Sequence, residues 1–301
     1  MGMRYGFAKA YAKINLTLDI LGILPDGYHD LEMVMQSVSL CDSVAVRIGC
    51  GGDVSVISNV GHIPNDERNI AVKAARAFSD AYGKDCGGIA IAMEKRVPSS
   101  AGMAGGSADG AAVLRLLNEL NEKPFSEKEL CEIGLTVGAD VPFCLMGGTS
   151  LAKGKGEILT ELGIMPDCYI VIGKPRRGMS TKAVFTEIDS HPIYKHPDTD
   201  GMIRAIKDGN IHGVADYVYN VFEPVVSFEV PDILAIKRTL RECGALCAAM
   251  TGSGSAVFGI FQSKKNAENA KNVLKRRFVD TFMTKPITSS EVRKCTWISQ
   301  E

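Results

Sequence analysis

Hydrophobic and polar residues alternate along residues 11–21, YAKINLTLDIL. A period of two is typical of a β-strand that buries one face. We therefore predict a half-buried strand here, followed by a turn at Asp26-Gly27. The residues predicted on the buried face are Ile14, Leu16, Leu18 and Ile20, and those on the other face are Lys13, Asn15, Thr17 and Asp19.

The rest of the chain mixes short apolar runs with segments of helical spacing. Residues 69–83, for example, place apolar side chains three and four apart and end at Gly83. We predict further strands at 43–48, 88–97, 147–159 and 168–175, and two more around a Gly-Ser turn within 246–261. We predict further helices ending near 121 and at 126–137, 181–188, 199–221, 232–242 and 265–278.

Composition limits the classes of function. The chain has 301 residues, 46% hydrophobic and 23% charged, with a net charge of -1. This is typical of a globular protein of about two domains, and it gives no bulk attraction for nucleic acid or an acidic membrane. We find no apolar run long enough for a membrane helix and no signal peptide, so we expect a cytoplasmic protein. The nine cysteines form no C-x-x-C pair, which argues against a zinc site or a disulfide framework.

The stretch VPSSAGMAGGSADGAAVLRLL, residues 97–117, packs small residues between a predicted strand and a predicted helix. Free amides at a helix start suit a phosphate. A tight connection with Ser107 as a simple N-cap explains the same composition equally well. The Walker A pattern is absent, and neither small-residue loop completes G-x-G-x-x-G, so a different phosphate loop is required.

The residues PSSAGMAGGSAD resemble the ATP loop of the GHMP kinases, a family named for galactokinase, homoserine kinase, mevalonate kinase and phosphomevalonate kinase. Four further stretches narrow the resemblance to the branch whose alcohol acceptor carries a cytidine diphosphate group. They are AKINLTLDILGILPDGYHDLE, GLTVGADVPFCLMGGTSLAKGKGE, NVFEP and MTGSGSAVFGIF. The match spans nearly the whole chain in the right order, which makes it far more specific than the loop alone.

The resemblance implies an α+β fold. It consists of a ribosomal-protein-S5-like ATP domain, which we place at residues 1–160, and a ferredoxin-like domain at 161–301. It also implies an ATP-dependent kinase of non-mevalonate isoprenoid biosynthesis, with Mg²⁺ accompanying ATP. The runner-up functions are a homoserine or mevalonate type of GHMP kinase, or a non-catalytic relative that binds nucleotide. We expect a small-molecule substrate and neither nucleic acid nor a membrane as a partner. The sequence does not indicate an oligomeric state.

The resemblance assigns the nucleotide to residues 98–108, with Ser107 as a candidate Mg²⁺ ligand. Two positions depart from the family pattern. Ala104 stands where glycine is usual and Ala108 where serine is usual, so methyl groups narrow the space for phosphates. Asp109 matches a position that is commonly acidic or an amide. The residues of the loop are Pro98, Ser99, Ser100, Ala101, Gly102, Met103, Ala104, Gly105, Gly106, Ser107 and Ala108.

Lys13 and Asp140 match the catalytic pair of the family. Phosphoryl transfer to an alcohol needs a carboxylate near the hydroxyl proton and a cation near the developing charge. Taken alone, Lys13 reads as a solvated strand lysine and Asp140 as a helix N-cap ahead of Pro142.

The segment Gly27-Tyr28-His29 matches the cytidine-binding segment, with Phe185 as the candidate for a second aromatic face. Taken alone, Tyr28 and His29 pass for turn residues and Phe185 for a helix core residue. Asn15 is a candidate acceptor contact. The loop 252–254 either closes against the substrate or is only a hairpin turn.

Overall fold

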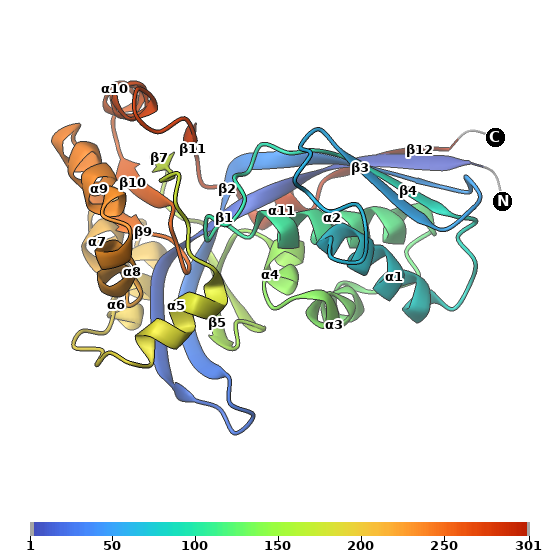
Figure 1. Ribbon diagram of the computed structural model, residues 1–301, viewed down its shortest axis with the longest axis horizontal. Helices are drawn as coiled ribbons and strands as arrows, with labels where there is room; N and C mark the ends of the chain where they lie inside the picture. The colour runs from blue at the N-terminus through green and yellow to red at the C-terminus, as the bar shows by residue number, and fades with distance from the viewer. Residues whose placement is uncertain (1–2, 300–301) are drawn as a thin grey trace.

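Two long antiparallel strands run through both halves of the molecule (Figure 1). The computed structural model describes residues 3–299. Strands β1 (Arg4–Ile23) and β2 (His29–Ile48) are each much longer than the segments predicted from the sequence. Both strands extend from one half of the molecule into the other. Some of their residues therefore lie between the two halves.

The first half is a sheet covered on one face by helices (Figure 1). Its strands lie in the order β12-β1-β2-β4-β3, and only β3 and β4 in this series are parallel. Helices α1 and α2 bury Phe78 and Leu114 against it. The bounds are β3 (Val54–Ser58), β4 (Ile89–Glu94), β12 (Cys295–Ser299), α1 (Ile70–Tyr82) and α2 (Gly105–Leu120).

Helix α1 confirms the prediction for residues 69–83. The side chain of Asn69 accepts a hydrogen bond from the Ala71 amide at the N-terminus. Gly83 ends the helix in the left-handed region at φ 64°, a conformation that glycine adopts with little strain.

The second half is a four-stranded antiparallel sheet in the order β11-β7-β10-β9. With its helices this is the split βαβ arrangement of a ferredoxin-like domain, as the family resemblance implied. The predicted strand pair within 246–261 is confirmed by β9 and β10. The bounds are β7 (Tyr169–Gly173), β9 (Cys247–Met250), β10 (Val257–Phe261), β11 (Thr281–Thr284), α9 (Asp232–Glu242) and α10 (Lys264–Lys275).

The connecting segments contain three corrections. The single helix predicted at 199–221 is wrong, because Gly209 adopts φ 64° and Asn210 caps a new helix. The strand predicted at 147–159 is a hairpin. The segment GADVPF, residues 138–143, is predicted as a turn from its sequence, but Val141 begins a short helix. The bounds are α3 (Glu127–Val137), α4 (Val141–Met146), β5 (Thr149–Gly154), β6 (Ile158–Gly163), α5 (Thr181–Ile188), α6 (Thr199–Lys207), α7 (Ile211–Tyr217), β8 (Tyr219–Asn220), α8 (Glu223–Glu229) and α11 (Ser289–Val292).

Strand β1 also corrects the prediction of a half-buried strand. Residues 12–20 are buried on both faces of the strand. Register shifts between Tyr11 and Lys13 and between Asn15 and Thr17 interrupt the alternation. Each bulge exchanges the faces, so Leu16 packs in the hydrophobic cluster that contains Ile170 and Leu18 in the other cluster, which contains Leu31.

The last described strand of the chain pairs with the first. Strand β12 pairs with β1, with Arg4 opposite Ser299 and Ala8 opposite Cys295. The division at residue 160 stays a prediction from the sequence, and the last strand belongs to the sheet of the first half. None of the helices within residues 3–299 is long and apolar enough to cross a bilayer.

Candidate active site

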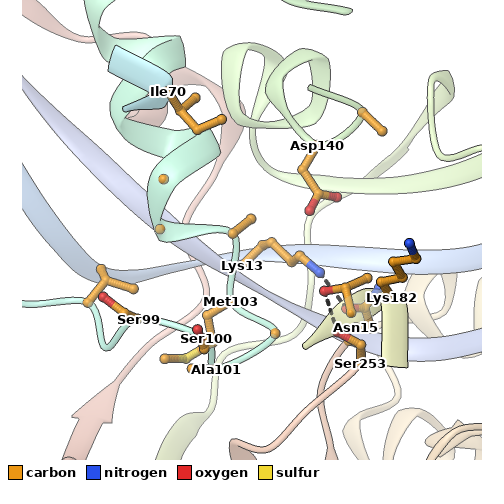
Figure 2. A pocket seen from close by; sticks show the side chains of 18 of the residues that line it. Lys13, Asn15, Ile70, Ser99, Ser100, Ala101, Met103, Asp140, Lys182 and Ser253 are labelled. Carbon is orange, nitrogen blue, oxygen red and sulfur yellow. Dashed lines mark hydrogen bonds between the residues drawn. The ribbon is translucent and has the colours of Figure 1, made fainter. Parts of the chain in front are cut away.

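A cavity of about 990 Å³ lies between the two halves (Figure 2). Strands β1 and β2, the loop before α2, the start of α4, helix α5 and the β9–β10 loop all contribute to its wall. It gathers nearly all the residues singled out from the sequence; Ser107 and Ala108 do not line it. The lining includes Lys13, Asn15, Tyr28, His29, Asp140, Phe185, Gly252, Ser253 and every residue from Pro98 to Gly106.

Helix α2 begins inside the small-residue loop. Its first intrahelical hydrogen bond runs from the Ala108 amide to the Ala104 carbonyl, at 2.8 Å. The amides of the first three helical residues, Gly105 to Ser107, precede this bond, and Gly105 and Gly106 line the cavity. Ala104 is the N-cap residue and its side chain makes no capping bond, so the interpretation of Ser107 as N-cap is wrong.

The glycines of the loop have two separate causes. A Cβ at Gly102 would lie 2.1 Å from the Thr251 carbonyl oxygen, so this position is bare because the β9–β10 loop packs against it. A Cβ at Gly106 would meet nothing closer than Ile70 Cγ1, at 3.5 Å. Gly106 is also exposed. Space for a ligand therefore exists at Gly106 and the helix start, whereas Gly102 joins the two loops.

The two departures from the family pattern differ in their setting. Ala104 lies at φ 54° in the left-handed region, which strains any residue with a Cβ and explains why glycine is usual there. Ala108 is buried and does not line the cavity. The expectation that both methyl groups narrow the phosphate space therefore fails for Ala108.

Lys13 is not a solvated lysine. Its side chain is buried, and its ammonium donates a hydrogen bond to Asn15 Oδ1 at 2.7 Å. The bulges of β1 fix both residues through their backbone amides. The Lys13 amide donates to the Met103 carbonyl at 3.1 Å, and the Asn15 amide donates to Thr251 Oγ1 at 2.9 Å. Lys13 and Asn15 are thereby held at a fixed distance from both cavity loops.

Asp140 occupies the N-cap position of α4, yet its side chain makes no capping hydrogen bond. Within residues 3–299 its carboxylate has no hydrogen-bond partner and no cation within 4.0 Å, Lys13 included. Figure 2 shows this carboxylate directed into the cavity, above the Lys13 ammonium. Helix capping therefore explains the position of Asp140 but gives its negative charge no role.

The predicted cytidine residues lie together at one end of the cavity. His29 Nε2 pairs with Asp189 Oδ1 at 2.7 Å, and its ring packs on Phe185 with centroids 4.7 Å apart. Tyr28 is 62% exposed, and the Lys155 ammonium lies 4.0 Å from its ring centroid. A base stacked on Tyr28 would use the ring face opposite Lys155, and one stacked on Phe185 would require His29 to turn.

A buried charge cluster beside the loop was missed. Lys95 bonds to both Asp42 and Asp109, and Asp109 Oδ1 has no partner within the described residues. Burial raises the pKa of Asp109 to about 7, although Lys95 opposes the shift. Burial disfavours the charged form of Lys95, but the two carboxylates outweigh it and raise its pKa. Asp42, Lys95 and Asp109 are far apart in the sequence, so no local sequence pattern predicts this cluster.

The cavity also has an apolar end that the sequence did not reveal. Ile63, Pro64, Ile70 and Val97 line it. Figure 2 places Ile70 beside the start of α2, on the far side from Lys182 and Ser253. The helix start thus lies between an apolar lobe and the Lys13–Asp140 region.

A ferredoxin-like half joined to a half with a glycine-rich loop, and a lysine and a free carboxylate in the cavity between them, define a small-molecule kinase of the GHMP type. The family described as GHMP kinases N terminal domain matches residues 69–148, and GHMP kinases C terminal matches residues 202–280.

Individual relatives narrow the family further. The 4-diphosphocytidyl-2-C-methyl-D-erythritol kinase of Clostridium acetobutylicum is 42% identical over 279 residues, 93% of this chain and 99% of that protein. The enzyme of the same name from Caldicellulosiruptor bescii is 45% identical, over 92% of this chain and 96% of its own. This chain belongs to the GHMP kinase family, and within it to the 4-diphosphocytidyl-2-C-methyl-D-erythritol kinases.

Solved structures agree with the family. The crystal structure of a 4-(cytidine 5'-diphospho)-2C-methyl-D-erythritol kinase superposes with a TM-score of 0.79 at 28% identity, over 93% of this chain and 98% of that chain. A homoserine kinase from Cytophaga hutchinsonii gives 0.76 at 18% identity, over 99% and 98% of the two chains. At that identity the second match shows the fold alone.

Proposed function

We propose that this chain transfers the terminal phosphoryl group of ATP to the 2-hydroxyl of 4-diphosphocytidyl-2-C-methyl-D-erythritol, a step in non-mevalonate isoprenoid biosynthesis. One observation carries the proposal. A single cavity holds the aromatic cluster at Tyr28, a free carboxylate at Asp140, and an open helix start at Gly105 and Gly106. An acceptor with a base at one end and an alcohol at the other spans the first two.

The helix start supports binding of the ATP phosphates. The amides of Gly105 to Ser107, for which the described residues provide no backbone acceptor, and the positive end of α2 attract negative charge. The apolar lobe at Ile63 and Ile70 adjoins this helix start and offers a surface for the purine. ATP placed in this way directs its terminal phosphate toward Lys13 and Asp140.

Asp140 would act on the acceptor hydroxyl. Its carboxylate faces the cavity and has no partner within the described residues, so it is available to accept or orient the proton that leaves the hydroxyl. Lys13 would stabilise the charge on the transferring group, because its ammonium is already fixed by Asn15. Asn15 would contact the acceptor from the same strand.

Mg²⁺ would supply charge neutralisation at the phosphates, and the residues present fit it. Mg²⁺ usually keeps several waters and binds one or two protein oxygens besides the phosphates. A Cβ at Gly138 would lie 4.0 Å from Ser107 Oγ, which places this hydroxyl near the segment that carries Asp140. Ser107 Oγ stays our candidate ligand, because Ser107 is the third residue of α2 and follows the cavity-lining Gly106, although Ser107 itself does not line the cavity.

The test is consumption of ATP by the purified chain with three acceptors: the cytidyl substrate, homoserine and mevalonate. We expect turnover with the cytidyl substrate alone, and a product heavier by one phosphoryl group. Preference for homoserine or mevalonate would replace the acceptor in this proposal. Nucleotide binding without turnover of any acceptor would favour a non-catalytic relative. A cytoplasmic location also stays a prediction from the sequence.

A further inference from the structure

Lys182 is a cation of the cavity with no evident use. It lines the wall as the second residue of α5. Figure 2 shows its side chain extending from α5 into the space on the side of Asp140. Within residues 3–299 it has no acidic neighbour within 4.0 Å and no side-chain hydrogen bond. The other cations of the lining are engaged: Lys13 with Asn15, Arg68 with Asp66, Lys95 with Asp42 and Asp109, and Lys155 with Asp26.

The position of Lys182 does not stabilise its own helix. Ser180 caps α5, so Lys182 lies in the first turn, where the helix dipole disfavours a positive charge. An unpaired ammonium at the positive end of a helix and in the wall of a cavity is a site for an anion.

Lys182 also lies between the two ends of the acceptor path. Its neighbour Thr181 hydrogen-bonds Ser253, with their hydroxyl oxygens 3.0 Å apart, in the loop that packs beside Asn15. Phe185, three residues further and on the same face of the helix, packs against His29 at the base end. A group that joins a base at Phe185 to an alcohol near Asn15 would run along the part of α5 that carries Lys182.

We infer that Lys182 binds the diphosphate bridge of the acceptor and thereby selects an alcohol linked to a nucleoside diphosphate over a free alcohol. The inference rests on the proposed function for the direction in which the acceptor lies. The bridge carries a negative charge on each phosphate, and every other cation of the lining already has a partner among the residues that the structure describes. Lys182 is a specificity residue, since it touches the part of the acceptor that does not react.

Titration calorimetry of the full chain with CDP and with cytidine tests this inference. In Lys182→Met we expect CDP affinity to fall about 10- to 100-fold, the usual loss for a charge-assisted hydrogen bond. Cytidine affinity should stay within about twofold of the unaltered chain, because the base contacts remain. Lys182→Arg keeps the charge and should recover most of the CDP affinity.

A matched control variant tests whether removing a positive charge from the start of any helix has the same effect. Lys265 is likewise the second residue of a helix, after the N-cap Ser263, and lies on α10 outside the cavity. Lys265→Met should leave both affinities unchanged. Unchanged CDP binding in Lys182→Met would overturn the inference, as would an equal loss for cytidine and CDP.

Kinetics separate this inference from the proposed function. With the cytidyl acceptor, Lys182→Met should raise the acceptor KM and leave kcat and the ATP KM nearly unchanged, because binding to the bridge is lost equally in ground and transition states. If the unaltered chain turns over the acceptor but Lys182→Met binds CDP normally, only the inference fails. If the unaltered chain shows no turnover while Lys182→Met loses CDP selectively, only the proposed function fails.

Discussion

The Asp140→Asn variant distinguishes a catalytic role of the Asp140 carboxylate from a role as helix cap. The substitution keeps the size of the side chain, and Asn caps helices about as well as Asp. Because the Asp140 side chain makes no capping bond, no such bond can be lost. Removing its charge from the start of α4 costs about 0.3–1 kcal/mol of stability, which in a chain of this length lowers Tm by only a few degrees.

The expected loss of activity is much larger. A positioned acid or base contributes roughly 10²- to 10⁴-fold, or about 2.7–5.4 kcal/mol of the activation barrier. We therefore expect kcat to fall by that factor while the acceptor KM changes little, because the interaction belongs to the transition state. Steady-state ADP release at saturating ATP measures both constants, and thermal unfolding measures the stability.

The result that refutes this reasoning is a folded Asp140→Asn protein with nearly normal kcat. It would leave positioning by the phosphate loop as the main source of rate. Lys13→Met supplies an independent check, because methionine keeps the buried volume and removes the ammonium bonded to Asn15. The double variant should lose less than the two single losses combined, since both groups act on one proton and one phosphoryl group.

Four further predictions follow from the cavity. Gly106→Val should raise the ATP KM without unfolding the chain, because its Cβ has room beside Ile70 and its methyl groups enter the cavity; normal ATP affinity would move the phosphates elsewhere. Ala104→Gly should add up to about 1 kcal/mol of stability in urea unfolding, because relief of left-handed strain exceeds the entropy cost of glycine. Between about pH 4 and 7, Asp109 is protonated in the folded chain and ionised in the unfolded chain. Its contribution to the free energy of unfolding therefore falls as the pH rises through this range. The gain in unfolding free energy from Asp109→Asn should therefore grow over that range and level off above it. An acceptor without cytidine, 2-C-methyl-D-erythritol 4-phosphate, should have a much lower kcat/KM, and equal values would remove base recognition.

The order of the motifs predicted more than the periodicity did. Residues next to a glycine-rich loop or an aromatic turn could be assigned because each motif is local, and the structure gathers them in one cavity. The periodicity of residues 11–21 misled, because bulges near Lys13 and Asn15 exchange the faces of the strand. Asp42, Lys95 and Lys182 carry no local pattern, since their roles depend on neighbours brought close only by folding.

The pairing of β12 with β1 joins two strands that lie far apart along the chain. Arg4 pairs with Ser299, so β1 is synthesised long before the strand that completes this edge of the first sheet. At about 5–20 residues per second, ribosomal synthesis separates the two by tens of seconds. During that interval the outer edge of β1 offers unpaired backbone groups, and Phe7, which is half exposed even in the finished fold, lies along it. A nascent chain is therefore open to strand exchange with its neighbours at this edge, and faster synthesis of the intervening segment shortens the exposure.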